Sequence, residues 1–260
     1  MFSVEHAEVP VQPRPVQWRT ALRALAGLAR DSGRTDYVFT ILAALAGDNL
    51  ERVYQAFRRT PHGQRLLRER PSLMALLSDR ARLQAMPKGS LGQEYLRVTD
   101  AAKISAKGLV DAQVMGIDPE IRRALDPERR YVADRLRDMH DLWHVLTEYG
   151  TDETGEIANL WFSVGQLGHR GMAFIAFFGT LDGTVRAGFA WPRYCYQAWL
   201  RGRRAARLVS EPLEEMLDRP VDEVRRRLRI APTSGVHPEG IRRGDRRDGR
   251  LGRRARTSSR

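Results

Sequence analysis

Apolar side chains recur at helical spacing along most of the chain, and convincing strand alternation is absent from the sequence. Leu22, Leu25 and Leu28, for example, fall on one face of a helix. Gly, Asp and Pro separate such segments in the way that helix caps and turns do. The pattern predicts helices over residues 18–29, 37–45, 49–58, 91–103, 127–149, 151–167, 172–178, 192–208, 212–217 and 221–230, and two short helices that begin at Pro61 and Pro71. We therefore expect an all-α fold.

The helical pattern predicts a single multi-helix domain over residues 18–231. Residues 1–17 contain Pro10, Pro13 and Pro15, which indicates a flexible N-terminal arm. Residues 232–260 are rich in Gly, Arg and Ser and almost lack large apolar side chains. Such a segment cannot bury enough apolar surface to fold, so we expect a disordered basic tail.

The net charge and the cysteine content exclude few classes of function. The net charge is +12, but the tail alone carries nine Arg against three acidic residues and so supplies half of it. Such a tail could bind nucleic acid or an anionic membrane, yet nucleic-acid binding would rest on the tail alone and is not expected. The single Cys195 excludes a disulfide framework and fits a reducing compartment.

The chain also lacks the usual membrane and export signals. Its longest run without a charged residue or His, 157–168, has 12 residues, and the runs 37–47 and 171–181 have 11 each, whereas a bilayer needs about 20. Residues 1–18 lack the basic start and apolar core of a signal peptide. We expect a cytoplasmic, bacterial-type protein without a transmembrane segment.

Metal-capable side chains gather in one stretch, which has the pattern H-D-x-x-H-x11-E. His140 and His144 are four residues apart, so they share a helix face at the edge of a buried apolar stripe. Asp141 can add a carboxylate ligand or orient an imidazole. If the chain turns back near Gly150, the next helix brings Glu156 level with the histidines. This set suits Zn, Fe or Mn; the alternative is two boundary histidines paired with local carboxylates.

The helix expected over 151–167 carries a polar stripe beginning at Glu156. The stripe continues with Asn159, Ser163 and Gln166, in steps of three, four and three residues. It holds no Lys or Arg and one acid only. That composition favours a partly enclosed polar pocket over an open solvent face.

The same residues resemble the Coq4 family of ubiquinone biosynthesis proteins. The resemblance covers about residues 20–230 and is carried by segment 137–146, Gly155-Glu156-Ile157, Trp161-Phe162, Gln166, Phe177-Phe178-Gly179 and, upstream, Pro87, Gly89, Ser90-Leu91-Gly92 and Tyr95. Three features depart from the family: His169-Arg170 stand where a Leu-Pro pair is common, segment 108–124 is less familiar, and the basic tail is not a family feature. None of them touches the H-D-x-x-H-x11-E residues.

The resemblance implies an all-α enzyme that binds a divalent metal ion through His140, Asp141, His144 and Glu156, which would also be its catalytic residues. Zn is the first expectation, with Fe, Mn or Mg as alternatives. The implied reaction is metal-dependent oxidative decarboxylation at C1 of a polyprenylated 4-hydroxybenzoate-type precursor of ubiquinone. The implied partners are this precursor, other ubiquinone biosynthesis proteins and the surface of the inner membrane. A homodimer is a further possibility.

Several residues are candidates for holding the substrate. Arg137, three residues before His140, could engage a carboxylate by a bidentate contact; the alternative is a solvated helix arginine. Gln166 ends the polar stripe. Met172, Phe174 and Phe178 could line a channel for the prenyl tail or meet the membrane; the alternative is ordinary core packing.

Two other functions compete with this one. In a non-catalytic lipid-binding scaffold of the biosynthetic complex, the metal would be structural; a closed four-ligand site would favour that function, and an open position would favour an enzyme. A metallohydrolase is the second alternative, because H-D-x-x-H is one methylene shorter than H-E-x-x-H. A zincin, however, places Glu after its first His as general base, and the sequence does not supply the separate His and Asp of HD phosphohydrolases.

Overall fold

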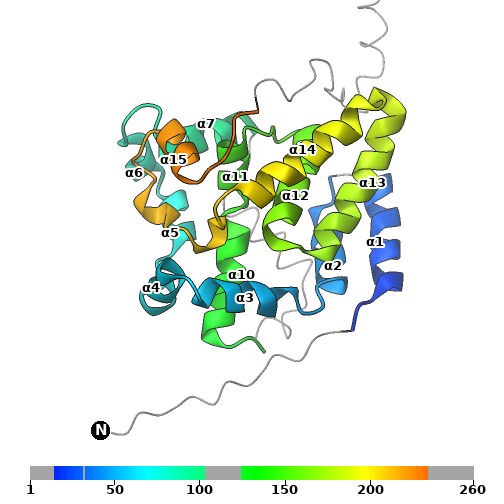
Figure 1. Ribbon diagram of the computed structural model, residues 1–260, viewed down its shortest axis with the longest axis horizontal. Helices are drawn as coiled ribbons and strands as arrows, with labels where there is room; N and C mark the ends of the chain where they lie inside the picture. Colours follow the sequence, from blue (N-terminus) through cyan, green and yellow to red (C-terminus); the bar gives the residue numbers. More distant parts are fainter. Residues whose placement is uncertain (1–14, 32, 103–123, 234–260) are drawn as a thin grey trace, which may run out of the picture.

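The computed structural model describes residues 15–31, 33–102 and 124–233 (Figure 1). Within these ranges the regular elements are helices, and the β structure is limited to an isolated antiparallel bridge between Ser90 and Pro220. The predicted all-α, single-domain fold is confirmed. Residues 1–14 of the predicted arm, most of segment 108–124 and residues 234–260 of the predicted tail lie outside the described residues.

Labels follow Figure 1, where the numbering passes from α7 to α10. The α-helices are α1 (Trp18–Arg30), α2 (Thr35–Ala44), α3 (Asn49–Arg58), α4 (Pro61–Glu69), α5 (Leu73–Ser78), α6 (Arg80–Gln84), α7 (Leu91–Ala102), α10 (Pro127–Asp138), α11 (His140–Thr147), α12 (Glu153–Leu167), α13 (Arg170–Ala187), α14 (Ala190–Arg204) and α15 (Val221–Arg227). Two 3₁₀ turns, η1 (Leu208–Ser210) and η2 (Leu213–Glu215), lie between α14 and α15.

Caps and prolines mark several helix starts as the sequence predicted. Thr60 caps α4, with Pro61 in its first turn, and its hydroxyl accepts from the Gly63 N–H at 2.9 Å. Asp126 caps α10 by accepting from the N–H groups of Glu128 and Arg129. The second helix, predicted to begin at residue 37, instead begins at Thr35, so that Asp36 lies inside the first turn of α2 and pairs with Arg34.

The helix predicted over 127–149 is in fact two helices, α10 and α11, which meet at Met139. Met139 keeps near-helical backbone angles, and no Gly or Pro marks the junction, so the sequence carried no sign of it. The buried stripe survives the break, because Val132, Met139 and Trp143 are all buried. The second helix ends at Thr147, where Glu148 takes a left-handed conformation, rather than at Gly150.

The short apolar helix predicted over 172–178 is also corrected, because α13 continues to Ala187. Gly179, which directly follows the predicted end of that helix, lies inside α13 together with Gly183. A Cβ at Gly179 would lie 2.2 Å from Cδ1 of Ile157, and one at Gly183 would lie 2.3 Å from Nε1 of Trp191. These glycines therefore allow α13 to approach α12 and α14 closely. The helix predicted over 212–217 is only the 3₁₀ turn η2.

Figure 1 shows α12 near the middle of the molecule, with α13, α2 and α1 on one side and α11, α7 and α15 on the other. The main core lies among the helices from α3 to α12 together with α14 and α15. A smaller core joins α1, α2 and α13 around Ala21, Ile41 and Ile175. None of the described helices is long and apolar enough to cross a membrane. The two helices of the predicted metal site thus lie next to each other within the main core.

Candidate metal centre

A tight hairpin connects α11 to α12 and sets the level of the site. Asp152 caps α12, with Oδ1 accepting from the Gly155 N–H at 2.8 Å. The turn folds back onto this first helical turn so closely that a Cβ at Gly155 would lie 1.8 Å from the carbonyl oxygen of Gly150. Glycine is therefore needed at position 155. Glu156, the next residue, is held in the first turn of α12 and faces α11.

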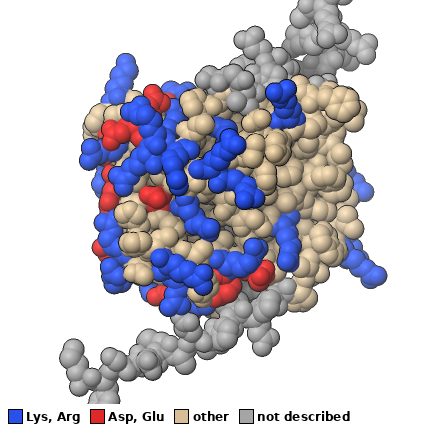
Figure 2. Space-filling view, in the orientation of Figure 1, with Lys and Arg blue, Asp and Glu red and all other residues tan. Residues whose placement is uncertain are grey.

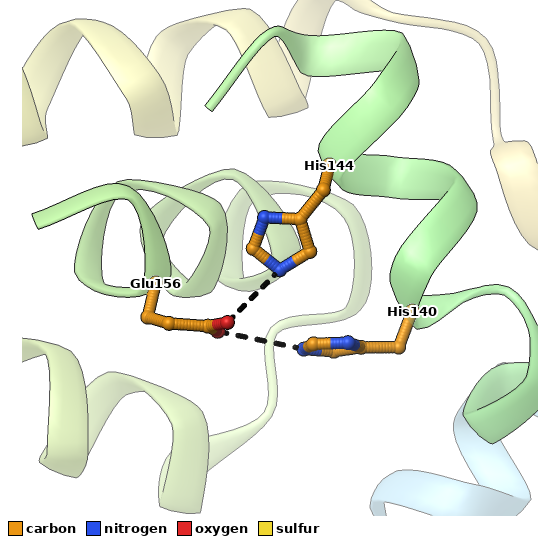
Figure 3. A group of neighbouring side chains, drawn as sticks. All are labelled: His140, His144 and Glu156. Carbon is orange, nitrogen blue, oxygen red and sulfur yellow. Dashed lines mark ion pairs between the residues drawn. The ribbon is translucent and has the colours of Figure 1, made fainter. Parts of the chain in front are cut away.

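The hairpin brings His140, His144 and Glu156 together (Figure 3). Nε2 of His144 lies 3.3 Å from Oε1 of Glu156, and Nε2 of His140 lies 3.7 Å from Oε2. One ligand atom from each residue lies within 4.8 Å of the others. Ligands about 2.1 Å from a tetrahedral ion are about 3.4 Å apart. The three side chains, called the triad below, could therefore hold one divalent ion after small movements.

Both imidazoles are held from their Nδ1 side. Nδ1 of His144 lies 3.2 Å and 3.1 Å from the carbonyl oxygens of Tyr149 and Gly150. A carbonyl can only accept, so Nδ1 carries a proton and donates it to the turn, and Nε2 is the nitrogen left to face Glu156 or a metal ion. Nδ1 of His140 lies 3.1 Å from Oδ1 of Asp141. Histidines that bind metals are commonly oriented in this way by carbonyls and carboxylates.

The triad has a buried and an open side. The side chain of His144 is 1% exposed, whereas those of His140 and Glu156 are 36% and 40% exposed among the described residues. Burial lowers the pKa of His140, but the hydrogen bond to Asp141 and the charges of Glu156 and Asp141 outweigh it and raise that pKa to about 9. Burial raises the pKa of Glu156, but the two histidines lower it by more. The pKa of Glu156 is therefore below its usual value. A positive charge is thus favoured beside Glu156.

Asp141 is the one member of the implied ligand set that does not join the triad. Its carboxylate is nearly buried and faces Nδ1 of His140, on the far side of the ring from Glu156. This position fits the other role that the sequence allowed, which is to orient an imidazole. The structure does not support Asp141 as a metal ligand.

Asn159 and Ser163, in the middle of the polar stripe of α12, are buried, and Gln166 at its far end connects parts of the fold. The side-chain amide of Gln166 donates to the carbonyls of Gly202 and Ala206, and its oxygen accepts from the Leu208 N–H. Gln166 thereby ties α12 to the chain after α14, and its substrate-binding role has no support. Asn159 is buried, and its Oδ1 makes no hydrogen bond among the described residues.

Arg137 is neither solvated nor directed to an open site. Its side chain is 7% exposed and pairs with Asp138 at 2.6 Å and Asp134 at 3.2 Å. Two acids one and three residues away on the same helix thus neutralise the guanidinium. Its substrate-binding role stays a prediction that this pairing does not favour.

The apolar candidates on α13 divide between the core and the surface. Met172 packs against the main core. Phe174 contacts Trp18 of α1, with ring centroids 6.0 Å apart, and Phe178, at 5.0 Å. The outer apolar face, as we call it, consists of exposed large apolar side chains on α1, on α13 and just after α13: Trp18, Leu22, Phe177, Phe178, Leu181, Val185 and Phe189. A prenyl channel that starts at the triad stays a prediction.

Figure 2 shows few charged side chains on the part of the surface over α13, whereas Lys and Arg crowd the part over α15 and α3. Val185 and Phe189, at 89% and 90% exposed, are the most open members of the outer apolar face. The sequence placed Phe174 and Phe178 among the candidates for a membrane contact but missed Val185 and Phe189, because it ended the helix at Phe178.

The sequence also missed the groups that anchor His144. They are backbone carbonyls of the turn, and such groups cannot be predicted from residue types because every residue has one. Two arginines from distant parts of the chain, Arg201 and Arg225, hold the end of α11. Only the folded chain brings them there.

Comparisons with known proteins match this architecture. The family model described as "Coenzyme Q (ubiquinone) biosynthesis protein Coq4" matches residues 11–234. The chain is 29% identical over 229 residues to the mitochondrial ubiquinone biosynthesis protein COQ4 homolog of Mus musculus, covering 87% of this chain and 82% of that protein. It is 26% identical to the coq4 protein of Schizosaccharomyces japonicus, over 88% of this chain and 93% of that protein.

The fold is also similar to a crystal structure of a protein from Nostoc punctiforme PCC 73102. The TM-score is 0.60 at 22% identity, and the match covers 86% of this chain and 98% of the other. This likeness concerns the fold alone. Because the family model spans most of the sequence, however, the chain belongs to the Coq4 family of coenzyme Q (ubiquinone) biosynthesis proteins.

Proposed function

We propose that this protein acts in ubiquinone biosynthesis as a metal-dependent enzyme that removes the C1 carboxyl group of a polyprenylated 4-hydroxybenzoate-type ring in an oxidative step. The observation that carries the proposal is the triad, in which two anchored imidazoles present Nε2 to the two oxygens of one carboxylate. His140 and Glu156 are partly exposed among the described residues, so this side of the triad is the one that a substrate would approach. Family membership supplies the pathway.

The residue types fit a bound divalent ion. Two His and one carboxylate with open positions form a set used for Zn and for non-haem Fe(II), so Zn is the first expectation and Fe, Mn or Mg the alternatives. A divalent ion here would supply Lewis acidity toward the ring hydroxyl or carboxylate. His144 is the buried anchor, Asp141 fixes the ring of His140, and Glu156 with His140 lines the open side. Structural metal sites usually have four protein ligands, whereas catalytic sites have three and an open position. The three residues of the triad therefore favour an enzyme.

The two alternatives differ in what they explain. A lipid-binding scaffold would account for the outer apolar face but gives no reason for the open side of the triad. A metallohydrolase would need a free general base after the first histidine. Asp141 occupies that position, but its carboxylate faces Nδ1 of His140. We therefore keep the scaffold as the second candidate.

A chromosomal deletion of the gene tests the proposal. The deletion strain should lack ubiquinone and accumulate a polyprenylated precursor that still carries its carboxyl group. Wild type and the exposed control Glu223→Gln on α15 should restore ubiquinone, whereas Glu156→Gln should not. Normal ubiquinone in the deletion strain would contradict the pathway assignment. Full rescue by Glu156→Gln would instead favour the scaffold.

We also propose that the outer apolar face rests on the cytoplasmic surface of the inner membrane, where a polyprenylated precursor would dissolve. A helix that is apolar on two faces needs a partner for both, and α13 uses its inner face against α12 and α14. Exposed Arg19, Arg23 and Arg193 flank the face in sequence and suit anionic headgroups.

Two protein partners compete for the same face. A symmetric homodimer formed through it would gather the arginines of both copies around one interface, which is unfavourable. Other ubiquinone biosynthesis proteins could bind alongside the membrane. Contact with the membrane therefore explains both the apolar face and its basic flank.

A further inference from the structure

We propose that Arg201 is a positioning residue for His144 and that it sets the metal affinity of the triad through the turn between α11 and α12. This inference rests on the proposed metal-binding function of the triad. Arg201 does not touch any of the three ligands. It acts on the backbone to which the imidazole of His144 is bonded.

The last turn of α11 is held by two guanidinium groups. Arg225 donates to the carbonyls of Val145 and Leu146, at 2.8 Å and 3.2 Å. Arg201 donates from both terminal nitrogens to the carbonyl of Thr147, at 3.1 Å each. Carbonyls in the last turn of a helix have no partner within the helix, and a cation at this end also meets the negative pole of the helix dipole. The end of α11 is therefore fixed by side chains from α14 and α15.

Arg225 also pairs with Glu148 at the start of the turn, at 3.5 Å, but the arginine that contacts Tyr149 is Arg201. Its guanidinium carbon lies 4.9 Å from the centroid of the Tyr149 ring, in a cation–π contact. The carbonyl of Tyr149, together with that of Gly150, faces Nδ1 of His144. Arg201 thus determines where the two acceptors of the imidazole lie. If they shifted, Nε2 would no longer be directed at Glu156.

Arg201 is itself firmly placed. It is buried on α14, the helix that packs along α12. Its Nε and Nη2 also donate to the carbonyl of Ala231, at 3.0 Å and 2.6 Å, in the chain that follows α15. Arg201 therefore links the end of α11, which carries His144, to α14, which packs against α12 and its Glu156. That link makes the spacing of the triad depend on Arg201.

Co²⁺ binding by the full chain tests this inference, because the visible spectrum of Co²⁺ reports ligand geometry in addition to affinity. We expect Arg201→Gln to weaken Co²⁺ binding about tenfold, the lower end for residues that orient a ligand, and to alter the spectrum at saturating Co²⁺. The matched control is Arg225→Gln. It removes a comparable helix-end contact and lowers the melting temperature, but it should leave the affinity and the spectrum of the site unchanged.

A second pair of variants approaches the link from the turn, in case Arg201→Gln does not fold. Tyr149→Leu removes the ring beneath Arg201 and should reproduce the loss of affinity. Tyr149→Phe keeps the ring and its contact with Arg201 and should behave as wild type.

The outcomes separate the two proposals. Unchanged Co²⁺ affinity and spectrum in Arg201→Gln or Tyr149→Leu, with binding lost in His144→Ala, would contradict the positioning role and leave the metal site intact. A wild-type protein that binds no Co²⁺ would contradict the metal site and this inference together.

Discussion

Helices α11 and α13 are both rich in apolar residues, yet they differ in how far these residues are buried. Seven of the eight residues of α11 are buried, and its last carbonyls are bonded to arginines from elsewhere in the chain. Helix α13 buries one face against α12 and α14 and leaves Phe177, Leu181 and Val185 exposed on the other. Arginines from α14 and α15 thus hold the end of the helix that carries two of the proposed metal ligands.

The difference indicates a division of work within one domain. A metal site needs its side chains fixed to within a fraction of an ångström, which burial and backbone bonds provide at α11. A surface that meets a membrane needs only apolar area and a basic flank, which α13 and its neighbours offer without further support. We therefore expect substitutions in the two regions to affect separate properties.

The largest effect is expected from removing the buried ligand. His144→Ala should weaken divalent metal binding by more than about 100-fold, since even a residue that only orients a ligand costs 10- to 100-fold. Binding to vesicles should not change. Calorimetric titration with Zn²⁺ and sedimentation with vesicles would check the two parts. A coupled loss of both properties in a folded protein would show that the two regions are not independent.

The converse substitution is the double variant Val185→Ser and Phe189→Ser. Fully burying a side chain of this size contributes about 1.5–3 kcal/mol, so losing two should weaken binding to anionic vesicles about 100-fold or more. Metal affinity and melting temperature should stay at wild-type values, because both side chains are exposed. Ala81→Ser, an exposed position on α6, is the control. Unchanged vesicle binding in the double variant would argue against the outer apolar face as the contact.

A smaller effect is expected from pH. Because the pKa of His140 is raised to about 9 in the metal-free protein, a proton competes with the metal for its Nε2. Apparent affinity for Zn²⁺ should rise about tenfold per pH unit from pH 7 toward 9 and level off above. A titration series in buffers of different ionisation enthalpy would measure the affinity and the released proton. A flat profile between pH 7 and 9 would contradict the raised pKa.

The same shift affects the stability of the metal-free protein. The folded pKa of about 9 lies above the unfolded value of about 6.5. Protonated His140 therefore stabilises the fold fully below about pH 6.5, and this contribution is lost as the pH rises through 9. In His140→Gln the loss of stability over this window should be smaller, which thermal melts of the metal-free protein would show.

The sequence predicted the fold class and the triad because both depend on spacing. Two histidines four positions apart and a turn near Gly150 suffice to place His140, His144 and Glu156 together. It could not predict that Arg137 is neutralised by Asp134 and Asp138, or that the amide of Gln166 is used by the chain after α14. Such pairings depend on rotamers and on tertiary neighbours.

Glycine was the least reliable guide to helix ends. Gly150 lies in a turn, as expected. Gly179 and Gly183, however, lie within α13, where the absence of a Cβ atom lets Ile157 and Trp191 pack against the helix. Spacing along the chain does not distinguish a glycine that ends a helix from one that lets two helices approach. The exposed length of α13 was underestimated for this reason.

The metal content of the purified protein tests the central claim most directly. Elemental analysis should find about one divalent ion per chain in wild type and in Glu223→Gln, and little in His140→Ala or Glu156→Gln. The variants should remain folded by circular dichroism. No metal in wild type, even after addition of Zn²⁺, Fe²⁺ or Mn²⁺ and removal of excess, would contradict the claim that the triad is a metal site.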